Sequence, residues 1–261
     1  MRILDLNVSN HHDNIVQLKD MIYEKNPDIC AFQEVMNGID DECFEIYQLR
    51  RGLDEIKEYP YTEFAPLFVA KGVTKNGIYV QSYGGRAQQG MMLLSKHEII
   101  DHQNLFYYND YKYEYDATHF REQDWCRSIQ SAIIKVEGKQ LQIINVHGVW
   151  NEDKTDDERT LAQTEFILKE ARDDIPSIIL GDFNLLPSTK SMDGFEPRFK
   201  NLIKEFDIKS TRPTFDDGLD KGDLVCDYIL VNDKIKVKAF EVVEKVISDH
   251  LALLMEFDLI D

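Results

Sequence analysis

Short apolar segments of strand length recur along almost the whole chain, and this pattern most narrows the folds open to it. The first strand begins at Arg2, and buried strands are indicated at 28–34, 90–96, 98–108 and 177–180. Two alternating apolar runs at 127–136 and 141–149 flank Gly138, which predicts a hairpin. Three more strands are expected at 226–231, 235–243 and 251–257.

Helical spacing of apolar residues is found in only a few places. It predicts helices at 13–26, ending before Pro27, and at 41–59, with a shorter helical piece at 199–206. Thr155 and Glu158 have the spacing of a capping box and predict the start of another helix. Many strands with few helices favour an α/β (α+β) protein with two stacked mixed sheets flanked by helices. No repeat or linker divides the chain, so we expect one domain over residues 1–261.

The composition is that of an ordinary globular protein, with 43% hydrophobic and 30% charged residues. The longest apolar runs are too short to cross a bilayer, and Met1 leads directly into the first strand, so we expect no membrane span and no targeting peptide. Four widely separated cysteines predict reduced, mostly buried thiols and a cytoplasmic location. No feature implies a protein partner.

The formal net charge is −18, which argues against a protein that coats nucleic acid non-specifically, but not against an enzyme that cleaves it. Two segments depart from this charge. No Asp or Glu lies between Phe64 and His97, and the segment 190–212 has six basic against four acidic residues. These segments are either phosphate-facing loops on an acidic body or ordinary solvated loops.

Polar side chains of a restricted kind stand at the ends of the apolar strands. They are Asn7, Gln33, Glu34, His147, Asp182, Asn184, Asp227, Ser248, Asp249 and His250. Alone, each has an ordinary explanation as a turn-former, a solvated carboxylate or a core histidine. Together they are carboxylates, amides and imidazoles with almost no Lys or Arg beside them in sequence, and buried carboxylates that converge need a cation. Gly181 is expected to permit a turn before Asp182.

The oxygen-rich set fits a hard divalent cation, Mg²⁺ first and Mn²⁺ as a possible substitute, better than zinc. A divalent cation next to imidazoles is suited to phosphoryl transfer, because the cation neutralises phosphate charge and lowers the pKa of water. The pattern therefore indicates a site for metal-assisted phosphoryl transfer.

The motifs LNV, FQEV, NVHG, GDFN, DYILV and SDH occur in this order between residues 4 and 257. Their order and wording resemble the endonuclease/exonuclease/phosphatase superfamily, which includes deoxyribonucleases, sphingomyelinases, inositol polyphosphate 5-phosphatases and deadenylases. The resemblance implies a four-layer α/β/β/α sandwich with its site at one end of the two sheets.

The resemblance also implies roles for individual residues. Glu34 would be the main magnesium ligand, and Asn7 and Asp249 would complete or orient the metal shell. Asp182 would position and deprotonate the attacking water, and Asn184 would hold a phosphate oxygen.

The remaining roles concern the substrate phosphate. His250 would bond the scissile phosphate and stabilise the pentacoordinate state, with its other ring nitrogen oriented by Asp227. His147 would be a second phosphate donor, and Arg127 is a weaker candidate for the same task.

Two differences from the motifs of some superfamily members indicate which branches this sequence resembles. Abasic-site and tyrosyl-DNA processing members usually carry an Asp at the position of Ser9, and abasic-site enzymes typically lack the histidine seen at His147. Both features favour the deoxyribonuclease, sphingomyelinase, phosphatase and deadenylase branches.

Three functions remain open from the sequence. The first, which the sequence favours, is a magnesium-dependent phosphodiesterase that acts on nucleic acid by in-line attack of an activated water. The second retains this chemistry on a small phosphorylated molecule or a lipid headgroup. The third, which the intact set of polar residues disfavours, is a catalytically silent binding module on the same fold.

Overall fold

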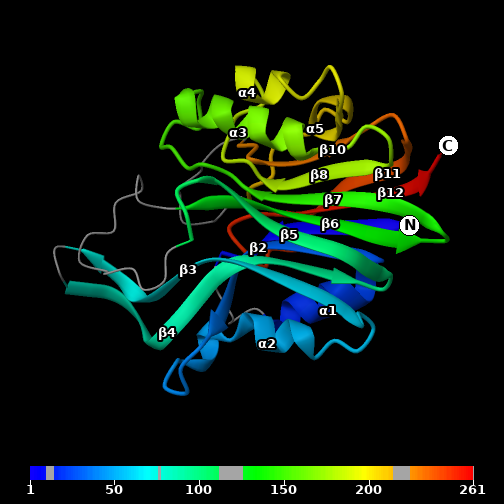
Figure 1. Cartoon of the computed structure of the whole chain (residues 1–261). Coiled ribbons are helices and arrows are strands. Elements are labelled where there is room, and N and C mark those ends of the chain that lie inside the picture. The colour runs from blue at the N-terminus through cyan, green and yellow to red at the C-terminus, as the bar shows by residue number, and fades with distance from the viewer. Residues whose placement is uncertain (10–14, 76–77, 112–125, 214–223, 261) are drawn as a thin grey trace.

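The computed structural model describes residues 1–9, 15–75, 78–111, 126–213 and 224–260. Two sheets pack face to face, and helices cover both outer faces (Figure 1). Helices α1 (Ile15–Lys25) and α2 (Leu49–Asp54) lie on one side, and α3 (Glu158–Glu170), α4 (Lys190–Asp193) and α5 (Leu202–Glu205) lie on the other. The predicted four-layer α/β/β/α sandwich is confirmed.

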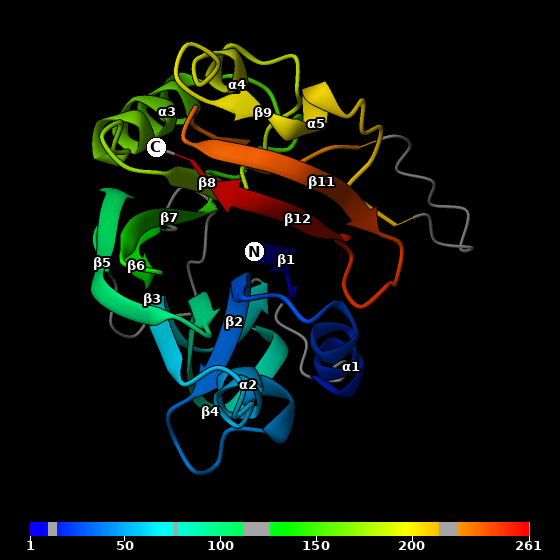
Figure 2. The same ribbon diagram turned by 90° about the vertical axis from the view of Figure 1, so that its right-hand side faces the viewer.

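Within the described residues, both sheets are mixed and contain six strands each. Their arrangement can be followed in Figures 1 and 2. The first has the order β11 (Ile235–Val243), β12 (Ala252–Leu259), β1 (Arg2–Asn7), β2 (Ile29–Gly38), β4 (Ile78–Ser95) and β3 (Tyr61–Lys75). The second has the order β5 (Glu98–Tyr108), β6 (Arg127–Val136), β7 (Lys139–His147), β8 (Ser177–Asp182), β10 (Asp227–Val231) and β9 (Lys200–Asn201).

Among the described strands, each sheet has one parallel pair, at its centre. In the first sheet β1 runs parallel to β2, with Asn7 in register with Gln33. In the second, β7 runs parallel to β8, with His147 in register with Asp182. The carboxyl ends of parallel strands meet at one edge of a sheet, so each pair carries its polar terminal residues to a common edge. This topology is why the strand-end residues can form one site.

The alternation of side chains along β1 explains how an apolar strand also supplies polar groups. Leu4 and Leu6 point outward and pack with the residues beneath α1 and α2. Ile3 points inward, into the main core between the sheets. Asp5 and Asn7 follow Ile3 on the inward face, because successive side chains alternate between the two faces.

Most predicted elements are present, and the hairpin about Gly138 is formed by β6 and β7 as expected. The helix predicted from residue 13 is α1, although residues 13 and 14 lie outside the described part of the chain. The predicted capping box was wrong. Asp157 caps α3 by accepting from Arg159 N and Thr160 N, and the Thr160 hydroxyl accepts from Asp157 N. Thr155 instead bonds the side chain of Asn151 in the preceding turn.

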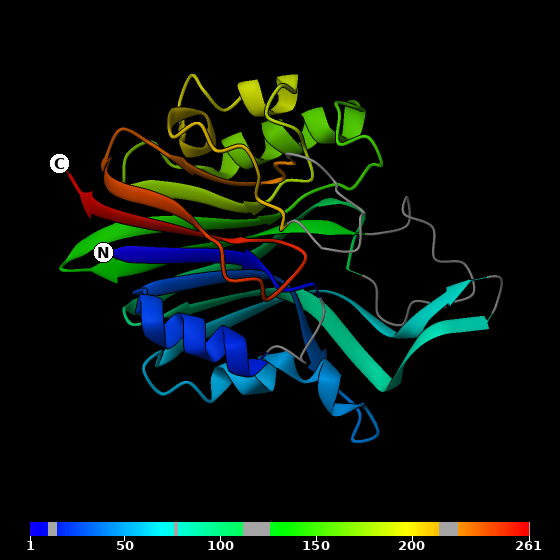
Figure 3. The same ribbon diagram turned by 180° about the vertical axis from the view of Figure 1, so that it is seen from behind.

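The segment 41–89 departs most from the sequence expectation. Only a short 3₁₀ turn at Glu45–Tyr47 and α2 form within the helix predicted at 41–59. The glycine-containing residues 84–90 continue β4, and β3 was not predicted. β3 and β4 form a long hairpin that projects beyond the sandwich (Figure 3). Three register irregularities interrupt their pairing, which breaks the period-two pattern that would reveal such a strand.

The four cysteines are buried free thiols, as predicted. In the part of the chain that the structure describes, no helix has the length and apolar character needed to span a membrane.

Gly181 lies inside β8 and not in a turn, which corrects the sequence expectation. Its φ is 128°, and a Cβ there would lie 2.1 Å from Val146 O of the paired strand β7. We expect Gly181→Ala to lower the free energy of unfolding by about 3 kcal/mol, because β7 and β8 must separate to admit the methyl group.

Urea unfolding measures this loss, with Gly138→Ala as the matched control. Gly138 also has a positive φ, of 85°, but its Cβ would meet nothing within 4 Å. It should lose only about 1 kcal/mol from backbone strain. Equal losses in the two variants would show that the close approach of β7 contributes nothing.

Candidate active site

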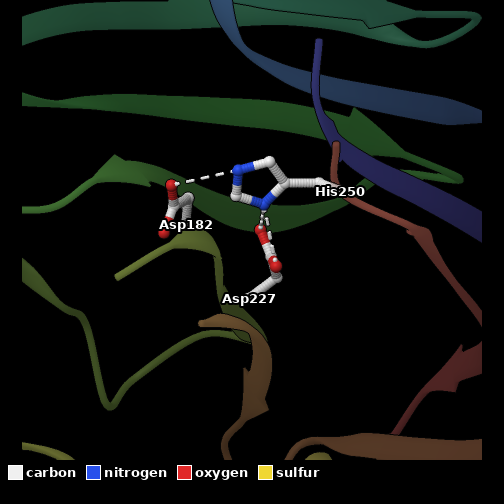
Figure 4. Close-up of side chains that lie close together, drawn as sticks. All are labelled: Asp182, Asp227 and His250. Carbon is white, nitrogen blue, oxygen red and sulfur yellow. Dashed lines mark hydrogen bonds and ion pairs between the residues drawn. The ribbon is translucent and has the colours of Figure 1, made fainter. Parts of the chain in front are cut away.

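Three of the predicted residues form a compact group at the ends of β8 and β10 (Figure 4). Asp182 is the last residue of β8, and Asp227, the first of β10, is directly opposite it in the antiparallel register. His250 comes from the connection between β11 and β12. Its Nδ1 lies 2.8 Å from Asp227 Oδ1, and its Nε2 lies 3.8 Å from Asp182 Oδ2. Asp227 therefore contacts the Nδ1 side of His250, and its role in orienting the ring for a reaction stays a prediction.

Hydrogen bonds from Thr211 and Tyr228 stabilise Asp227 and the loop after Asp182. Thr211 Oγ1 donates to Asp227 Oδ2 at 2.6 Å, and His250 Nδ1 lies 2.8 Å from Oδ1 and 3.0 Å from Oδ2 of the same carboxylate. The Tyr228 hydroxyl donates to Leu185 O at 2.7 Å and so fixes the loop that follows Asp182. Buried polar groups that are satisfied in this way hold a side chain in one rotamer.

Glu34 reaches the site through an irregularity in β2. Phe32 pairs with Met92 and Val35 with Gly90, so Gln33 and Glu34 stand together opposite a single residue of β4. Glu34 has a φ of 57°, in the left-handed region. Bulges re-aim side chains, and this one turns two consecutive residues towards the second sheet. Gln33 Nε2 bonds Asn145 Oδ1 of β7, and Glu34 Oε1 lies 3.6 Å from His147 Nε2.

Asn7 joins the contributions of the two sheets. Its Nδ2 donates to Glu34 Oε1 and to Asp182 Oδ2, both at 3.1 Å, while its Oδ1 accepts from Ser9 N at 2.9 Å. One amide group thus lies between two carboxylates that arrive from different sheets. Glu34, Asp182 and His250 therefore occupy one neighbourhood, which the sequence reading required.

The two histidines of the site have opposite electrostatic environments. Burial alone would lower the pKa of His250, but Asp227 and Asp182 outweigh it and raise this pKa to about 9. Burial, reinforced by the positive charge of Arg127, lowers the pKa of His147 to about 3. At neutral pH His250 is consequently a cation and His147 is neutral. Two groups whose pKa values are shifted in opposite directions can take different roles in one reaction.

The two carboxylates next to Asn7 also differ. Burial raises the pKa of Glu34, and the hydrogen bond from Asn7 offsets it only in part. Burial also acts to raise the pKa of Asp182, but the neighbouring His250 and His147 reverse the effect and the pKa is lowered. The site therefore lowers the pKa of Asp182, which stays ionised, and raises the pKa of Glu34.

The donor chemistry fits a hard divalent cation. Burial is the main cause that raises the pKa of Glu34, and the negative charges of Asp182 and Asp249 raise it further, so these carboxylates repel one another in the protein alone. Carboxylate and amide oxygens are the ligands that Mg²⁺ and Mn²⁺ take. Asp182, Asp227 and His250 also place one ligand atom each within 4.8 Å of one another, a second arrangement that could hold an ion.

Asp249 is engaged by a residue that the sequence reading did not single out. Arg212 Nη1 donates to Asp249 Oδ2 at 2.9 Å and to Asp249 O at 2.8 Å. The only sequence signal for Arg212 was its place at the end of the basic segment 190–212. It brings a guanidinium to the site, in contrast to the expected scarcity of basic residues there.

Lys154 was also missed. Its Nζ donates to Asn184 Oδ1 at 2.6 Å and lies 4.8 Å from the centroid of the Trp150 ring. Asn184 has a φ of 57°, its backbone N–H bonds Asp182 Oδ1 at 2.8 Å, and its Nδ2 donates to Gly148 O at 3.3 Å. Lys154 lies in an irregular loop with no periodic pattern, so its spacing in the sequence held no signal.

Arg127 is only 2% exposed and uses its guanidinium on the backbone. Its Nε donates to Gly148 O at 2.7 Å and its Nη1 to Cys126 O at 3.2 Å. These bonds hold the chain just beyond His147. Contact between Arg127 and a phosphate stays a prediction.

Most of the remaining basic residues of the segment 190–212 form ion pairs with nearby acidic residues or hydrogen bonds to carbonyl oxygens. Arg198 pairs with Asp173, and Lys204 pairs with Asp193 and Glu196. Lys200 pairs with Glu205, and Lys209 with Asp207. In the acid-free segment, Arg86 is bound by Asp40 at 2.7 Å. The acid-free segment forms most of β3 and β4, and the segment 190–212 contains α4, β9 and α5, so the expectation of two loops was wrong. Arg212 is the basic residue of 190–212 that pairs with Asp249 at the site.

Comparison with solved structures finds the same fold in other proteins of this kind. An endonuclease/exonuclease/phosphatase from Beutenbergia cavernae has a TM-score of 0.74 and 16% identity, covering 100% of this chain and 72% of that one. A family protein from Leptotrichia buccalis has a TM-score of 0.68 and 21% identity, with 99% and 100% covered. A mannosyl-6-phosphatase from Bacteroides thetaiotaomicron has a TM-score of 0.68 and 14% identity, with 99% and 100% covered.

These identities are low enough that the likeness establishes the fold alone. No curated protein sequence matches the chain. The model of the Endonuclease/Exonuclease/phosphatase family matches residues 6–250, a span that contains every predicted site residue. The chain therefore belongs to the endonuclease/exonuclease/phosphatase family.

Proposed function

We propose that this protein is a divalent-metal-dependent phosphoester hydrolase. The observation that carries the proposal is the convergence of Asp182 with the Asp227–His250 pair next to Glu34 and Asn7. Hydrolysis of a phosphoester needs an oriented water, donors to the phosphate oxygens and neutralised charge. The described side chains supply the first two, and the carboxylates offer ligands for the cation that supplies the third.

Asp182 orients the attacking water and accepts its proton. The carboxylate is held by Asn184 N on one oxygen and by Asn7 Nδ2 on the other, which fixes the direction of its free lone pairs. A base on a rigid strand end is better aimed than one on a loop. Asn184 donates to a phosphate oxygen through its amide.

His250 binds the scissile phosphate through Nε2 and stabilises the negative charge that accumulates on it. The bond between Nδ1 and Asp227 keeps the ring in place and the imidazole protonated. His147 is neutral and donates from the opposite sheet, and Arg127 supports the loop that follows it. A charged donor and a neutral one on the same phosphate match the growth of charge in the transition state.

Glu34, Asn7 and Asp249 would hold the cation, with magnesium as the first choice and manganese as the second. The bound cation supplies charge neutralisation at the phosphate and a lower pKa for water. Asn7 Oδ1 and Nδ2 would have to exchange places for its oxygen to become a ligand, an adjustment that amide side chains make at small cost.

Two substrate classes follow from the sequence, nucleic acid and small phosphorylated molecules. The pairing of Arg198, Lys200 and Lys204 with acids supports the second class, because a basic trough for a polynucleotide needs unpaired cations along it. The net charge of −18 supports it as well. We propose a small phosphorylated molecule or headgroup as the favoured substrate, with nucleic acid as the second candidate.

The test is a hydrolysis assay of the purified protein at neutral pH in millimolar Mg²⁺. Its substrates are sugar phosphates, phosphodiester headgroups, and single- and double-stranded DNA and RNA. We expect turnover of a small phosphoester that EDTA abolishes and that Mg²⁺ or Mn²⁺ restores. Glu34→Gln should raise the Mg²⁺ concentration for half-maximal activity by about 10-fold or more, because one charged ligand is lost.

Cleavage of polynucleotides beside inert small esters would instead establish the nuclease. Undiminished activity in EDTA would refute the metal dependence. If neither substrate class is turned over and Asp182→Asn binds every candidate ligand as the parent protein does, the silent binding module is the better account.

A further inference from the structure

A buried lysine lies in the site without a role in the scheme above. Lys154 follows β7 in an irregular loop and is only 8% exposed. Its Nζ has one hydrogen-bond acceptor among the described residues, Asn184 Oδ1 at 2.6 Å. No carboxylate of the described residues lies within ion-pair distance of it. A buried ammonium is ordinarily paired with an anion, and this one has N–H donors to spare.

Backbone hydrogen bonds hold the loop that contains Lys154 in a defined conformation. Lys154 has a φ of 54°, a strained conformation for a residue with a side chain. Leu186 N donates to Lys154 O at 2.9 Å, and Asn151 Oδ1 accepts from Thr155 N at 3.1 Å. The Trp150 ring lies 4.8 Å from Nζ and forms one wall. Strained backbone that several bonds hold in place is typical of residues that act on a ligand.

Lys154 also decides which way the amide of Asn184 faces. An ammonium only donates, so it fixes the amide oxygen of Asn184 on its own side. The Nδ2 group is thereby turned the other way, where it bonds Gly148 O at 3.3 Å. Nδ2 has a second hydrogen that the bond to Gly148 O does not use, and the backbone N–H of Asn184 bonds Asp182 Oδ1. Without the lysine either orientation of the amide would be available.

We propose that Lys154 binds a non-bridging oxygen of the substrate phosphate and positions the amide of Asn184 to bind another. The inference rests on the proposed function, because it places the phosphate beside Asn184 and Asp182. Lysine provides a point charge for one phosphate oxygen, and the amide provides a directed neutral bond. The substrate class is thus an ester whose phosphate has at least two accessible oxygens next to the scissile bond.

Inorganic phosphate is the probe, and isothermal titration calorimetry with Mg²⁺ present measures its binding to the full chain. We expect Lys154→Met to raise the Kd for phosphate by about 10- to 100-fold, the effect of one charged hydrogen bond. Lys154→Arg should recover part of the affinity, because it restores the charge. Lys169→Met removes the same charge from an exposed position of α3 and should bind phosphate as the parent protein does.

Turnover of the best ester separates binding from positioning. Lys154→Met should raise KM and also lower kcat, because the misdirected Asn184 amide fails to follow the phosphate into the transition state. Unchanged phosphate affinity in folded Lys154→Met would overturn the proposal, as would equal losses in Lys154→Met and Lys154→Arg. A purely structural lysine would lower the melting temperature and leave the phosphate Kd of the folded fraction unaltered.

If Lys154→Met does not fold, the parent protein still decides. The ¹⁵Nζ resonance of Lys154 should shift on addition of phosphate, and an unmoved resonance would refute the contact. The proposed function and this inference fail in different ways. If phosphate binding depends on Lys154 but no ester is hydrolysed, the proposed hydrolase is refuted and the phosphate site at Lys154 is retained. If an ester is hydrolysed but phosphate binding does not depend on Lys154, the hydrolase is retained and the Lys154 site is refuted.

Discussion

Asp182→Asn is expected to lower kcat by about 10³-fold, the contribution of a positioned general base, while KM changes little. The substitution keeps the shape of the side chain and removes the charge that accepts the proton of the water. Asp182 accepts from Asn184 N on one oxygen and from Asn7 Nδ2 on the other, so Asp182→Asn retains at least one of these two bonds and the orientation of the side chain. Steady-state hydrolysis with Mg²⁺ at saturating substrate measures the loss.

The control removes an equivalent charge elsewhere. Asp173→Asn takes a carboxylate from an exposed pair with Arg198 and should leave kcat as it is. Mg²⁺ affinity, measured by calorimetry, distinguishes the two arrangements of acidic groups in the site. If Asp182→Asn loses Mg²⁺ affinity by more than about 10-fold, Asp182 is a metal ligand, as the spacing of Asp182, Asp227 and His250 would allow. Retention of full kcat would refute both roles.

His250→Gln should lower kcat by about 10²- to 10³-fold, because it removes a charged donor aimed at the phosphate. Glutamine retains an N–H that can face Asp227, so the buried carboxylate is not left without any partner. Asp227→Asn should lower kcat by about 10- to 10²-fold, since a neutral amide no longer favours the imidazolium. Urea unfolding of each variant shows whether lost activity comes from lost protein.

The double variant tests whether Asp227 works through His250. If it does, His250→Gln/Asp227→Asn should be about as active as His250→Gln alone, because the orienting carboxylate has nothing left to orient. If the two residues act independently, the two losses in kcat should multiply in the double variant. That result would contradict a role of Asp227 through His250, although the two side chains lie 2.8 Å apart.

The strand ends of the site were predictable from the sequence for a local reason. Each apolar run had to be buried, so the polar residue after it had to lie at an edge of the core. Asn7, His147 and Asp182 were found in this way, and the structure places them together. Glu34 was found by the same reasoning, but the bulge and the left-handed φ that turn it into the site have no signature in the run FQEV.

Basic residues were the weakest part of the sequence reading. A charge count over 190–212 treats every Lys and Arg alike, whereas Arg198 and Lys204 bind acids brought near by the fold and Arg212 faces Asp249. Lys154 was missed because a loop residue without periodic neighbours can be placed only by the contacts of its own backbone. The bond from Leu186 N to Lys154 O is such a contact, between segments 32 residues apart.

The sequence by itself determined the strands that carry Asn7, His147 and Asp182, the sandwich class and the family, because burial of apolar runs is a short-range requirement written into residue order. Tertiary structure alone decided that the side chains of Arg212 and Lys154 reach the site, how Glu34 turns inward, and that β3 and β4 project as a hairpin. Charge pairing and strand register depend on groups that are distant in the chain, and their energies are settled only when packing brings those groups within a few ångströms.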